Sequence, residues 1–233
     1  MARDLVIVDY GHGGIYTGTY QTSGKQYHHI SAGLWVGEGI VNRCVAARLI
    51  RWLLRAGVDV FDCVAGKEWH RAPSWLELTQ QDVPLSHRVA RANEVQRERV
   101  NSPLISVHAN ALSRTSTGDG QPHRGISLWT SPGETRSDGL ARDLWWALVT
   151  YDGHGMQCNA GRDGQKDHES SFAILTRTVG PAVLIEGGFF DNLEDARIMI
   201  SSQGQRSLAY AYHEGIMRWL RRQRAAIGGG DGI

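Results

Sequence analysis

Residues 38–61, with the sequence EGIVNRCVAARLIRWLLRAGVDVF, contain the pattern that decides the fold. Apolar residues recur there at helical spacing until a glycine ends the pattern. These residues are Val41, Val45, Leu49 and Trp52, followed by Gly57. An apolar run at 58–61 follows the predicted helix, and another at 5–8 precedes it. The order strand, helix, strand is the unit from which parallel sheets are built, so the sequence predicts an α/β fold.

The same order of elements continues along the chain. Apolar runs of strand length alternate with stretches of helical periodicity and with polar, glycine-containing loops. Further strands are predicted at 104–107, 126–129, 172–175 and 182–185, helices at 85–100, 136–150, 193–200 and 205–222, and loops at 15–37 and 152–171. A chain of 233 residues without internal repeat or linker fits one well-buried domain. We expect this domain over residues 1–224 and a disordered tail over residues 225–233.

Charge and cysteine content narrow the class of protein. Lysine and arginine number 25 against 24 acidic residues, so a formal charge of +1 gives no net attraction to nucleic acid. Cys44, Cys63 and Cys158 form no CxxC pair and therefore predict neither a disulfide framework nor a thiolate zinc site. The first residues lead into a strand without the apolar core of a signal peptide or a membrane span. We expect synthesis in the cytoplasm and no transmembrane segment.

Polar residues end three of the predicted strands and open one helix. His12, His108 and Glu186 each come at the end of an apolar run. Open α/β sheets bind their ligands at the carboxyl ends of the strands, so these side chains are expected to lie close together. Glu38 begins the first helix on the same face as Val41, which directs its carboxylate toward the sheet. A carboxylate in that position needs a cation.

Each of the four polar residues has an ordinary explanation when it is taken alone. His12 is compatible with a loop histidine, Glu38 with the helix dipole, and His108 with a satisfied core histidine. Glu186 is harder to explain, because an unpaired carboxylate at the end of a buried strand costs free energy or binds a proton. Two neutral imidazoles, one carboxylate and a spare carboxylate are what a zinc hydrolase needs for its metal and its base. Together they predict a metal-dependent hydrolase.

Other metal and nucleotide motifs are incomplete. The turn at His12 lacks the third glycine of a dinucleotide-binding loop. An HExxH pattern that begins at His213 requires a second histidine at Met217, and one that begins at His168 reaches Phe172. No role is assigned to His28, His29, His154 and His168.

With these residues, the sequence resembles the zinc-dependent N-acetylmuramoyl-L-alanine amidases of the Amidase_3 type, found in bacterial cell-wall enzymes and phage endolysins. The matching segments run in family order across nearly the whole chain. They are IVDYGHGG at 7–14, EGIVNRCVAARLIRWLLRAG at 38–57, SHRVARAN at 86–93, LISVHAN at 104–110, RGISLW at 124–129 and PAVLIEGGFFDNLEDARIM at 181–199. Two residues depart from the family pattern: Tyr10 replaces a small residue or proline, and Gly187 replaces threonine or serine.

The resemblance implies a mostly parallel mixed sheet of about six strands with helices on both faces. It also implies that His12, Glu38 and His108 bind Zn²⁺ and that Glu186 is the catalytic carboxylate. The implied reaction is hydrolysis of the amide between N-acetylmuramic acid and L-alanine in peptidoglycan. Water activated by zinc and deprotonated by Glu186 is the expected nucleophile.

Substrate contacts and cellular setting are further expectations. Tyr27 and Trp35 in the loop at 15–37 are candidates for contact with glycan or peptide, and Asn110, which matches the family, is a third. We expect a monomer that acts on the bacterial cell wall after release, in the setting of phage lysis, and an injected antibacterial effector has the same sequence pattern. Four arginines near the end of the last predicted helix are Arg218, Arg221, Arg222 and Arg224. They favour either a weak contact with anionic envelope lipids or, more simply, charge complementarity to a helix C-terminus.

Two other functions stay open at this point. A zinc carboxypeptidase that trims stem peptides needs the same kind of metal site. A non-catalytic peptidoglycan-binding protein is expected to lack a metal ligand or Glu186, whereas all four residues are present.

Overall fold

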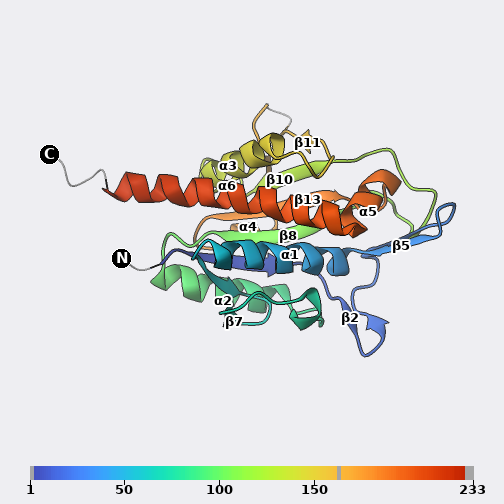
Figure 1. Ribbon diagram of the computed structural model, residues 1–233, viewed down its shortest axis with the longest axis horizontal. Coiled ribbons are helices and arrows are strands. Elements are labelled where there is room, and N and C mark those ends of the chain that lie inside the picture. Colours follow the sequence, from blue (N-terminus) through green and yellow to red (C-terminus); the bar gives the residue numbers. More distant parts are fainter. Residues whose placement is uncertain (1–2, 162–163, 229–233) are drawn as a thin grey trace.

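A central sheet organises the computed structural model, which describes residues 3–161 and 164–228 (Figure 1). Within these residues the sheet has eight strands in the order β11-β10-β13-β8-β1-β6-β7, and β12 pairs with β10. The strands are β1 (Leu5–Tyr10), β6 (Asp59–Asp62), β7 (Lys67–Trp69), β8 (Leu104–Asn110), β10 (Ile126–Thr130), β11 (Cys158–Asn159), β12 (His168–Glu169) and β13 (Ala182–Phe189). Only the pairs β10-β13 and β6-β7 are antiparallel. The predicted single-domain α/β fold with a mostly parallel mixed sheet is confirmed, with more strands than the six expected.

Helices cover both faces of this sheet. One face packs against α1 (Glu38–Arg55), α3 (Arg136–Thr150), α5 (Leu193–Ile200) and α6 (Ser202–Gly228). The other face packs against α2 (Leu85–Glu98) and α4 (Ala173–Thr176). Side chains alternate between the two cores along each strand: Val6 and Val8 of β1 join the first, and Leu5 and Ile7 the second. The strands are therefore apolar on both faces, as is typical of covered parallel sheets.

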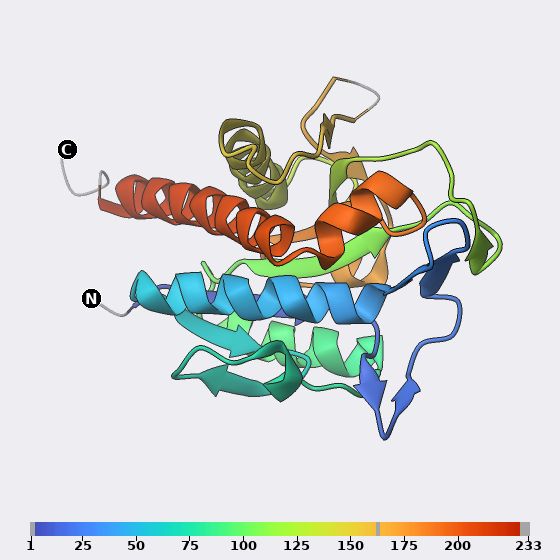
Figure 2. The same cartoon turned by 45° about the vertical axis from the view of Figure 1, so that its right-hand side comes forward.

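The first helix, α1, places its N-terminus at the carboxyl end of β1. Its apolar face is fully buried at Leu49, Ile50 and Leu53, against the sheet and α6. Gly57 follows the helix with a φ of 75°, the left-handed conformation that commonly ends helices and that glycine adopts without steric cost. Figures 1 and 2 show α1 and α6 side by side on the same face of the sheet.

The prediction of a loop at 15–37 is corrected, because the segment contains a short hairpin and two strands of a second small sheet. A hairpin consists of β2 (Ile15–Tyr16) and β3 (Thr19–Tyr20). A three-stranded sheet consists of β5 (Leu34–Gly37), β4 (Gln26–His29) and β9 (Thr117–Gly118). β5 leads directly into α1, so the hairpin of β4 and β5 lies beside the N-terminus of that helix (Figure 2).

One other expectation is corrected. The predicted strand at 172–175 is wrong, because the backbone N–H groups of Leu175 and Thr176 donate back to the carbonyl of Phe172 and form the short helix α4. A four-residue apolar run does not distinguish a strand from a buried helical turn. The helix α6 extends to Gly228, into the segment predicted as a tail, and residues 229–233 lie outside the described residues, so the disordered tail stays a prediction. No helix of the described part is long and apolar enough to cross a membrane.

The two departures from the family pattern have local explanations. Tyr10 is fully buried, and its hydroxyl donates to Asp62 Oδ2 at 2.8 Å. A Cβ atom at Gly187 would lie 2.7 Å from the hydroxyl oxygen of Tyr212, which is also fully buried. The Tyr212 side chain therefore fills the space that a threonine or serine at position 187 would need.

Candidate metal centre

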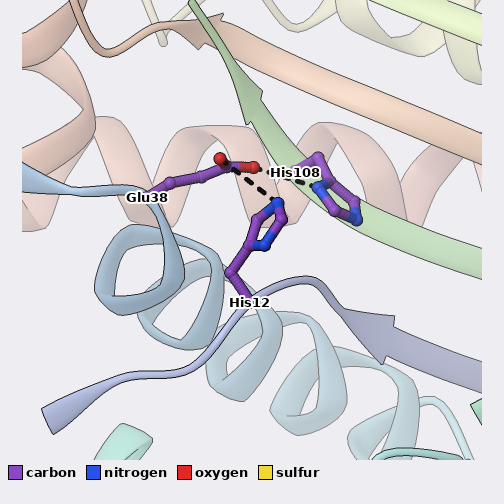
Figure 3. Close-up of side chains that lie close together, drawn as sticks. All are labelled: His12, Glu38 and His108. Carbon is purple, nitrogen blue, oxygen red and sulfur yellow. Dashed lines mark hydrogen bonds and ion pairs between the residues drawn. The ribbon is translucent and has the colours of Figure 1, made fainter. Parts of the chain in front are cut away.

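Three of the predicted site residues meet at the carboxyl end of the sheet. His12 follows β1, Glu38 is the first residue of α1, and His108 lies in β8. His108 Nδ1 lies 3.0 Å from Glu38 Oε1, and His12 Nε2 lies 3.4 Å from Glu38 Oε2. The two imidazole rings are perpendicular, with centroids 5.1 Å apart. Figure 3 shows both rings beside the Glu38 carboxylate, and one potential ligand atom from each residue lies within 4.8 Å of the others.

The backbone of the turn after β1 directs His12 toward Glu38. His12 has a φ of 63°, a left-handed conformation uncommon for residues other than glycine and often found at functional sites. Side chains of α1 hold the turn, because Asn42 Nδ2 donates to the carbonyl of Gly11 at 3.0 Å and Arg43 Nη1 donates to that of His12 at 2.7 Å. Asn42 and Arg43 are not recognisable as site residues from the sequence, because helix periodicity does not reveal which polar residues contact a distant turn.

The ring of His108 packs directly against the backbone of Gly11, which has no side chain. A Cβ atom at Gly11 would lie 1.8 Å from His108 Cε1, so any larger residue there would displace the ring. Below it, the buried Asp9 carboxylate accepts from Arg88 Nη1 at 2.7 and 2.8 Å and from Ser106 Oγ at 2.6 Å. Burial raises the pKa of Asp9, but the charges of Arg88 and His108 and the hydrogen bonds from Ser106 and Arg88 together lower it below its ordinary value. Arg88 thus supports the strand that precedes the His12 turn.

The protonation of the cluster follows from burial and mutual contact. Burial opposes charge on Glu38 and His108, yet their hydrogen bond and opposite charges lower the pKa of Glu38 and raise that of His108. Burial lowers the pKa of His12 to about 4. His12 is therefore neutral near pH 7, the form in which an imidazole binds a metal.

Glu186 lies next to this cluster on the neighbouring strand. Its Cα pairs with that of His108 in the parallel ladder between β13 and β8. Burial raises the pKa of Glu186 to about 7, and its buried Oε2 has no hydrogen-bond partner among the described residues. A carboxyl group with these properties is a candidate proton acceptor near neutral pH.

The donor atoms suit a zinc ion. Two imidazole nitrogens and one carboxylate oxygen form the ligand set of many catalytic zinc sites, which keep a further position for water. The buried Oε2 of Glu38 has no hydrogen-bond partner in the described part of the chain, and its nearest cation is the Lys25 ammonium at 3.4 Å. Lys25 is not recognisable from the sequence, since it lies in a polar segment without periodicity.

The expected substrate contacts differ in how much surface they offer. Trp35 is 40% exposed, and its ring packs edge-on against that of Tyr20. Asn110 ends β8, where its Cα pairs with that of Phe189, and its Oδ1 accepts from the N–H of Ala111 at 2.8 Å. Tyr27 is only 3% exposed, and its hydroxyl accepts from the N–H of Gly120, so it has almost no surface for a ligand and supports the β4 hairpin instead.

The four histidines left without a role lie apart from the metal cluster. His29 Nε2 lies 3.0 Å from the carbonyl oxygen of Phe190, and His154 Nε2 lies 3.0 Å from that of Leu148. His168 stacks on the ring of Trp129, and His28 is an exposed residue of β4. Among the described residues, the candidate metal cluster consists of His12, Glu38 and His108 and includes none of these four histidines.

Most arginines near the end of α6 are paired within the fold. Arg218 and Arg222 contact the Asp143 carboxylate at 3.0 and 2.9 Å, and Arg224 pairs with Asp4. These ion pairs weaken the basis for an envelope contact through this segment, which stays a prediction.

The raised pKa of Glu186 predicts a pH-dependent stability. With chelator present, the folded chain keeps the Glu186 proton up to about pH 7, whereas an unfolded chain releases it near the ordinary value of 4.5. Raising the pH through this window therefore lowers the free energy of unfolding, by about 3 kcal/mol at most. Glu186→Gln removes this decrease in the free energy of unfolding, because glutamine does not ionise. The variant should therefore unfold at a higher urea concentration than the wild type at pH 8, and at a similar urea concentration at pH 4.5. Equal urea midpoints of the variant and the wild type at pH 8 would contradict the conclusion that burial raises the pKa of Glu186. The control is Glu98→Gln at an exposed position, which should not change the midpoint.

Comparison with known proteins adds to this geometry. Residues 6–218 match the family described as Amidase_3, N-acetylmuramoyl-L-alanine amidase. The search of curated proteins gave no match. Similar solved structures include the N-acetylmuramoyl-L-alanine amidase of Clostridium difficile 630, with a TM-score of 0.68 and 22% identity over 94% of this chain and 97% of that one.

Two further structures share the same fold. Ami1, the N-acetylmuramyl-L-alanine amidase of Mycobacterium smegmatis, has a TM-score of 0.67 and 20% identity over 94% of this chain and 97% of that one. The catalytic domain of the CD27L endolysin, which targets Clostridia Difficile, has a TM-score of 0.59 and 21% identity over 93% of this chain and 98% of that one. At such identities the likeness shows a common fold.

Proposed function

Because this chain belongs to the Amidase_3 family of N-acetylmuramoyl-L-alanine amidases, we propose that it hydrolyses the amide between N-acetylmuramic acid and L-alanine in peptidoglycan, with zinc as its metal. The observation that carries this proposal is the convergence of His12, Glu38 and His108, with Glu186 on the adjacent strand. The arrangement also favours an enzyme over a non-catalytic peptidoglycan-binding protein, because the ligand set and the neighbouring carboxylate are complete.

His12, Glu38 and His108 are the proposed zinc ligands. A zinc ion bound there would polarise the scissile carbonyl and make water more acidic. Neutral His12 supplies one nitrogen donor, and the Glu38 carboxylate supplies the negative charge that a cation requires. Lys25, which contacts Glu38 at 3.4 Å, would be repelled by a bound cation, and its partly exposed side chain has room to move toward solvent.

Glu186 is the proposed general base and general acid. Its carboxylate would accept a proton from the attacking water and pass it to the leaving nitrogen of L-alanine. The raised pKa of Glu186, caused by burial, suits this exchange because a proton bound near neutral pH is readily accepted and readily returned. Its free Oε2 has no competing hydrogen-bond partner among the described residues.

Substrate binding is proposed at the surfaces beside this centre. Trp35, exposed on β5 next to the N-terminus of α1, offers an aromatic face to glycan or stem peptide. Asn110, at the end of β8, offers an amide to the same substrate. The proposed catalytic domain is 1–224, and the family match covers 6–218 of it.

The proposed setting is phage lysis. A protein synthesised in the cytoplasm and acting as a monomer on the cell wall after release fits the sequence expectations, and the endolysin among the similar structures supports this setting. An injected antibacterial effector is the other setting compatible with the same fold and site.

Removal of the metal tests the proposed activity. Purified peptidoglycan treated with the protein should release new L-alanine amino groups without new reducing ends, since only the amide is cut. Preincubation with a chelator should abolish this release, and added Zn²⁺ should restore it, because the ligands persist in the folded chain. Release of free D-alanine instead would indicate a carboxypeptidase, and amide hydrolysis that is unaffected by chelator would remove zinc from the proposal.

A further inference from the structure

A groove far from the metal centre has an unusual concentration of unpaired positive charge. It lies between α1, α6 and the segment before the 3₁₀ helix η1 (Trp75–Glu77), and its main hollow has a volume of about 570 Å³. Four arginines line it: Arg48, Arg51, Arg55 and Arg206. Among the described residues no Asp or Glu lines this hollow, although the whole chain has a formal charge of only +1.

The arginines of the groove are placed to act together. Arg48, Arg51 and Arg55 are three and four positions apart on α1, so they lie on one face of the helix. Like charges at this spacing repel each other and destabilise a helix unless something else compensates. In the described part of the chain, none of the four arginines forms an ion pair with a carboxylate, in contrast to Arg218 and Arg222, which share Asp143. The groove therefore lacks an internal anion.

Aromatic side chains accompany the charges. Trp52 and Trp75 line the main hollow, and the guanidinium of Arg55 lies 5.8 Å from the ring centroid of Trp52. An adjoining hollow of about 530 Å³ shares Trp52 and Arg206 with it and adds Tyr151 and Tyr210. This second hollow also includes Asp152, and the three arginines of α1 are not among the residues that line it. The two hollows meet at Trp52 and Arg206 and form one extended surface, in which arginines line the first hollow and aromatic rings line both.

This combination selects a chemical class of ligand. Guanidinium groups bind phosphate oxygens with two parallel hydrogen bonds, and they do so better than an ammonium. Aromatic faces pack against the carbon atoms of sugars and polyols. A single small anion would leave most of the extended surface without contact, whereas a linear polymer with repeated phosphodiesters would contact both hollows.

We propose that this groove binds a polyol-phosphate polymer attached to peptidoglycan and thereby holds the protein on the cell wall. The inference rests on the proposed function only in that the protein works on the wall. Arg48 and Arg55 are ten and seventeen residues beyond Glu38, which places the groove roughly 15 to 25 Å along α1 from the metal centre. The polymer and the glycan substrate can therefore bind at the same time.

The test measures binding to walls separately from catalysis. Cell walls that contain polyglycerol phosphate are sedimented with Glu186→Gln protein, in which the wall is not digested, with and without the further substitutions R51E, R55E and R206E. We expect these substitutions to weaken wall binding about tenfold or more, because three cationic contacts become repulsive. Walls stripped of the polymer with hydrofluoric acid should bind the parent protein as weakly as they bind the variant, and soluble polyglycerol phosphate should compete.

Matched substitutions separate the groove from net charge. R97E, R142E and R177E change the charge by the same amount at exposed arginines on other surfaces, and they should leave wall binding unchanged. Replacing Arg51, Arg55 and Arg206 with lysine should retain part of the binding, which a general loss of folding would not allow. Equal loss in both triple variants, or undiminished binding to stripped walls, would overturn the proposal.

Two more measurements distinguish polymer binding from lipid binding and from catalysis. If arginine-dependent binding occurs to phosphatidylglycerol vesicles but soluble polyglycerol phosphate does not compete for walls, the groove binds a lipid surface and the proposal is wrong. Hydrolysis of a soluble muropeptide, measured in the background with Glu186 intact, should be the same with and without the R51E, R55E and R206E substitutions. If the wild type does not hydrolyse that muropeptide, the amidase proposal fails, while the binding result stands independently.

Discussion

Replacing Glu186 with glutamine is expected to lower kcat for peptidoglycan hydrolysis by about 10²- to 10⁴-fold, the range that a lost general base typically costs. Glutamine keeps the size of the side chain but cannot accept the proton of the attacking water. Zinc content should stay near that of the wild type, because the metal cluster consists of His12, Glu38 and His108 without Glu186. Release of L-alanine amino groups gives the rate, and atomic absorption of the purified protein gives the metal content.

The control for this variant is Glu98→Gln at the exposed end of α2, which should keep full activity. Unchanged kcat in Glu186→Gln would exclude Glu186 from catalysis. Loss of both zinc and activity would instead make Glu186 a metal ligand. The same variant is expected to be more stable than the wild type at pH 8 in chelator, so a loss of activity through unfolding is distinguishable from a loss of the proton acceptor.

Replacing His108 with alanine should remove the metal and with it the activity. One nitrogen donor is lost, and Glu38, which is 1% exposed, loses its hydrogen bond to His108 Nδ1. Changes to residues that only support metal ligands already cost about 10- to 100-fold in affinity, so loss of a ligand should exceed this range. Zinc content after dialysis and the rate of amine release should fall together.

His87→Ala on the exposed side of α2 is the matched control and should retain both zinc and activity. Circular dichroism should show a folded His108→Ala protein, since the ring lies at the carboxyl end of β8 and outside the apolar core of the sheet. Retention of zinc with the affinity of the wild type would refute the proposed ligand set.

The sequence predicted which residues come together at the candidate site better than it predicted what surrounds them. His108 and Glu186 were recognisable because apolar strands end at them, and parallel strands bring such ends to one edge. Glu38 was recognisable from its register on α1. Contacts between distant segments left no comparable signal: Lys25 reaches Glu38 from a polar segment, and Arg43 holds the turn at His12.

The small sheets beside the site were not predicted for a related reason. β2 and β3 have two residues each, too few to show an alternating pattern, and β4 pairs with β9 far along the chain. Gly187 illustrates the same limit, because its departure from the family pattern is compensated by Tyr212 on α6. From the sequence alone, a glycine does not show which distant side chain occupies the space beside it.

The positions of His12, Glu38 and His108 on separate elements link the centre to folding itself. The turn after β1, the start of α1 and the strand β8 come together only when the sheet has assembled, so an unfolded chain presents no preformed set of ligands. Any cation that prefers the assembled set shifts the equilibrium toward the native chain by mass action. With zinc bound as proposed, supply of the ion would govern how much of the protein survives proteolysis as well as how fast it works.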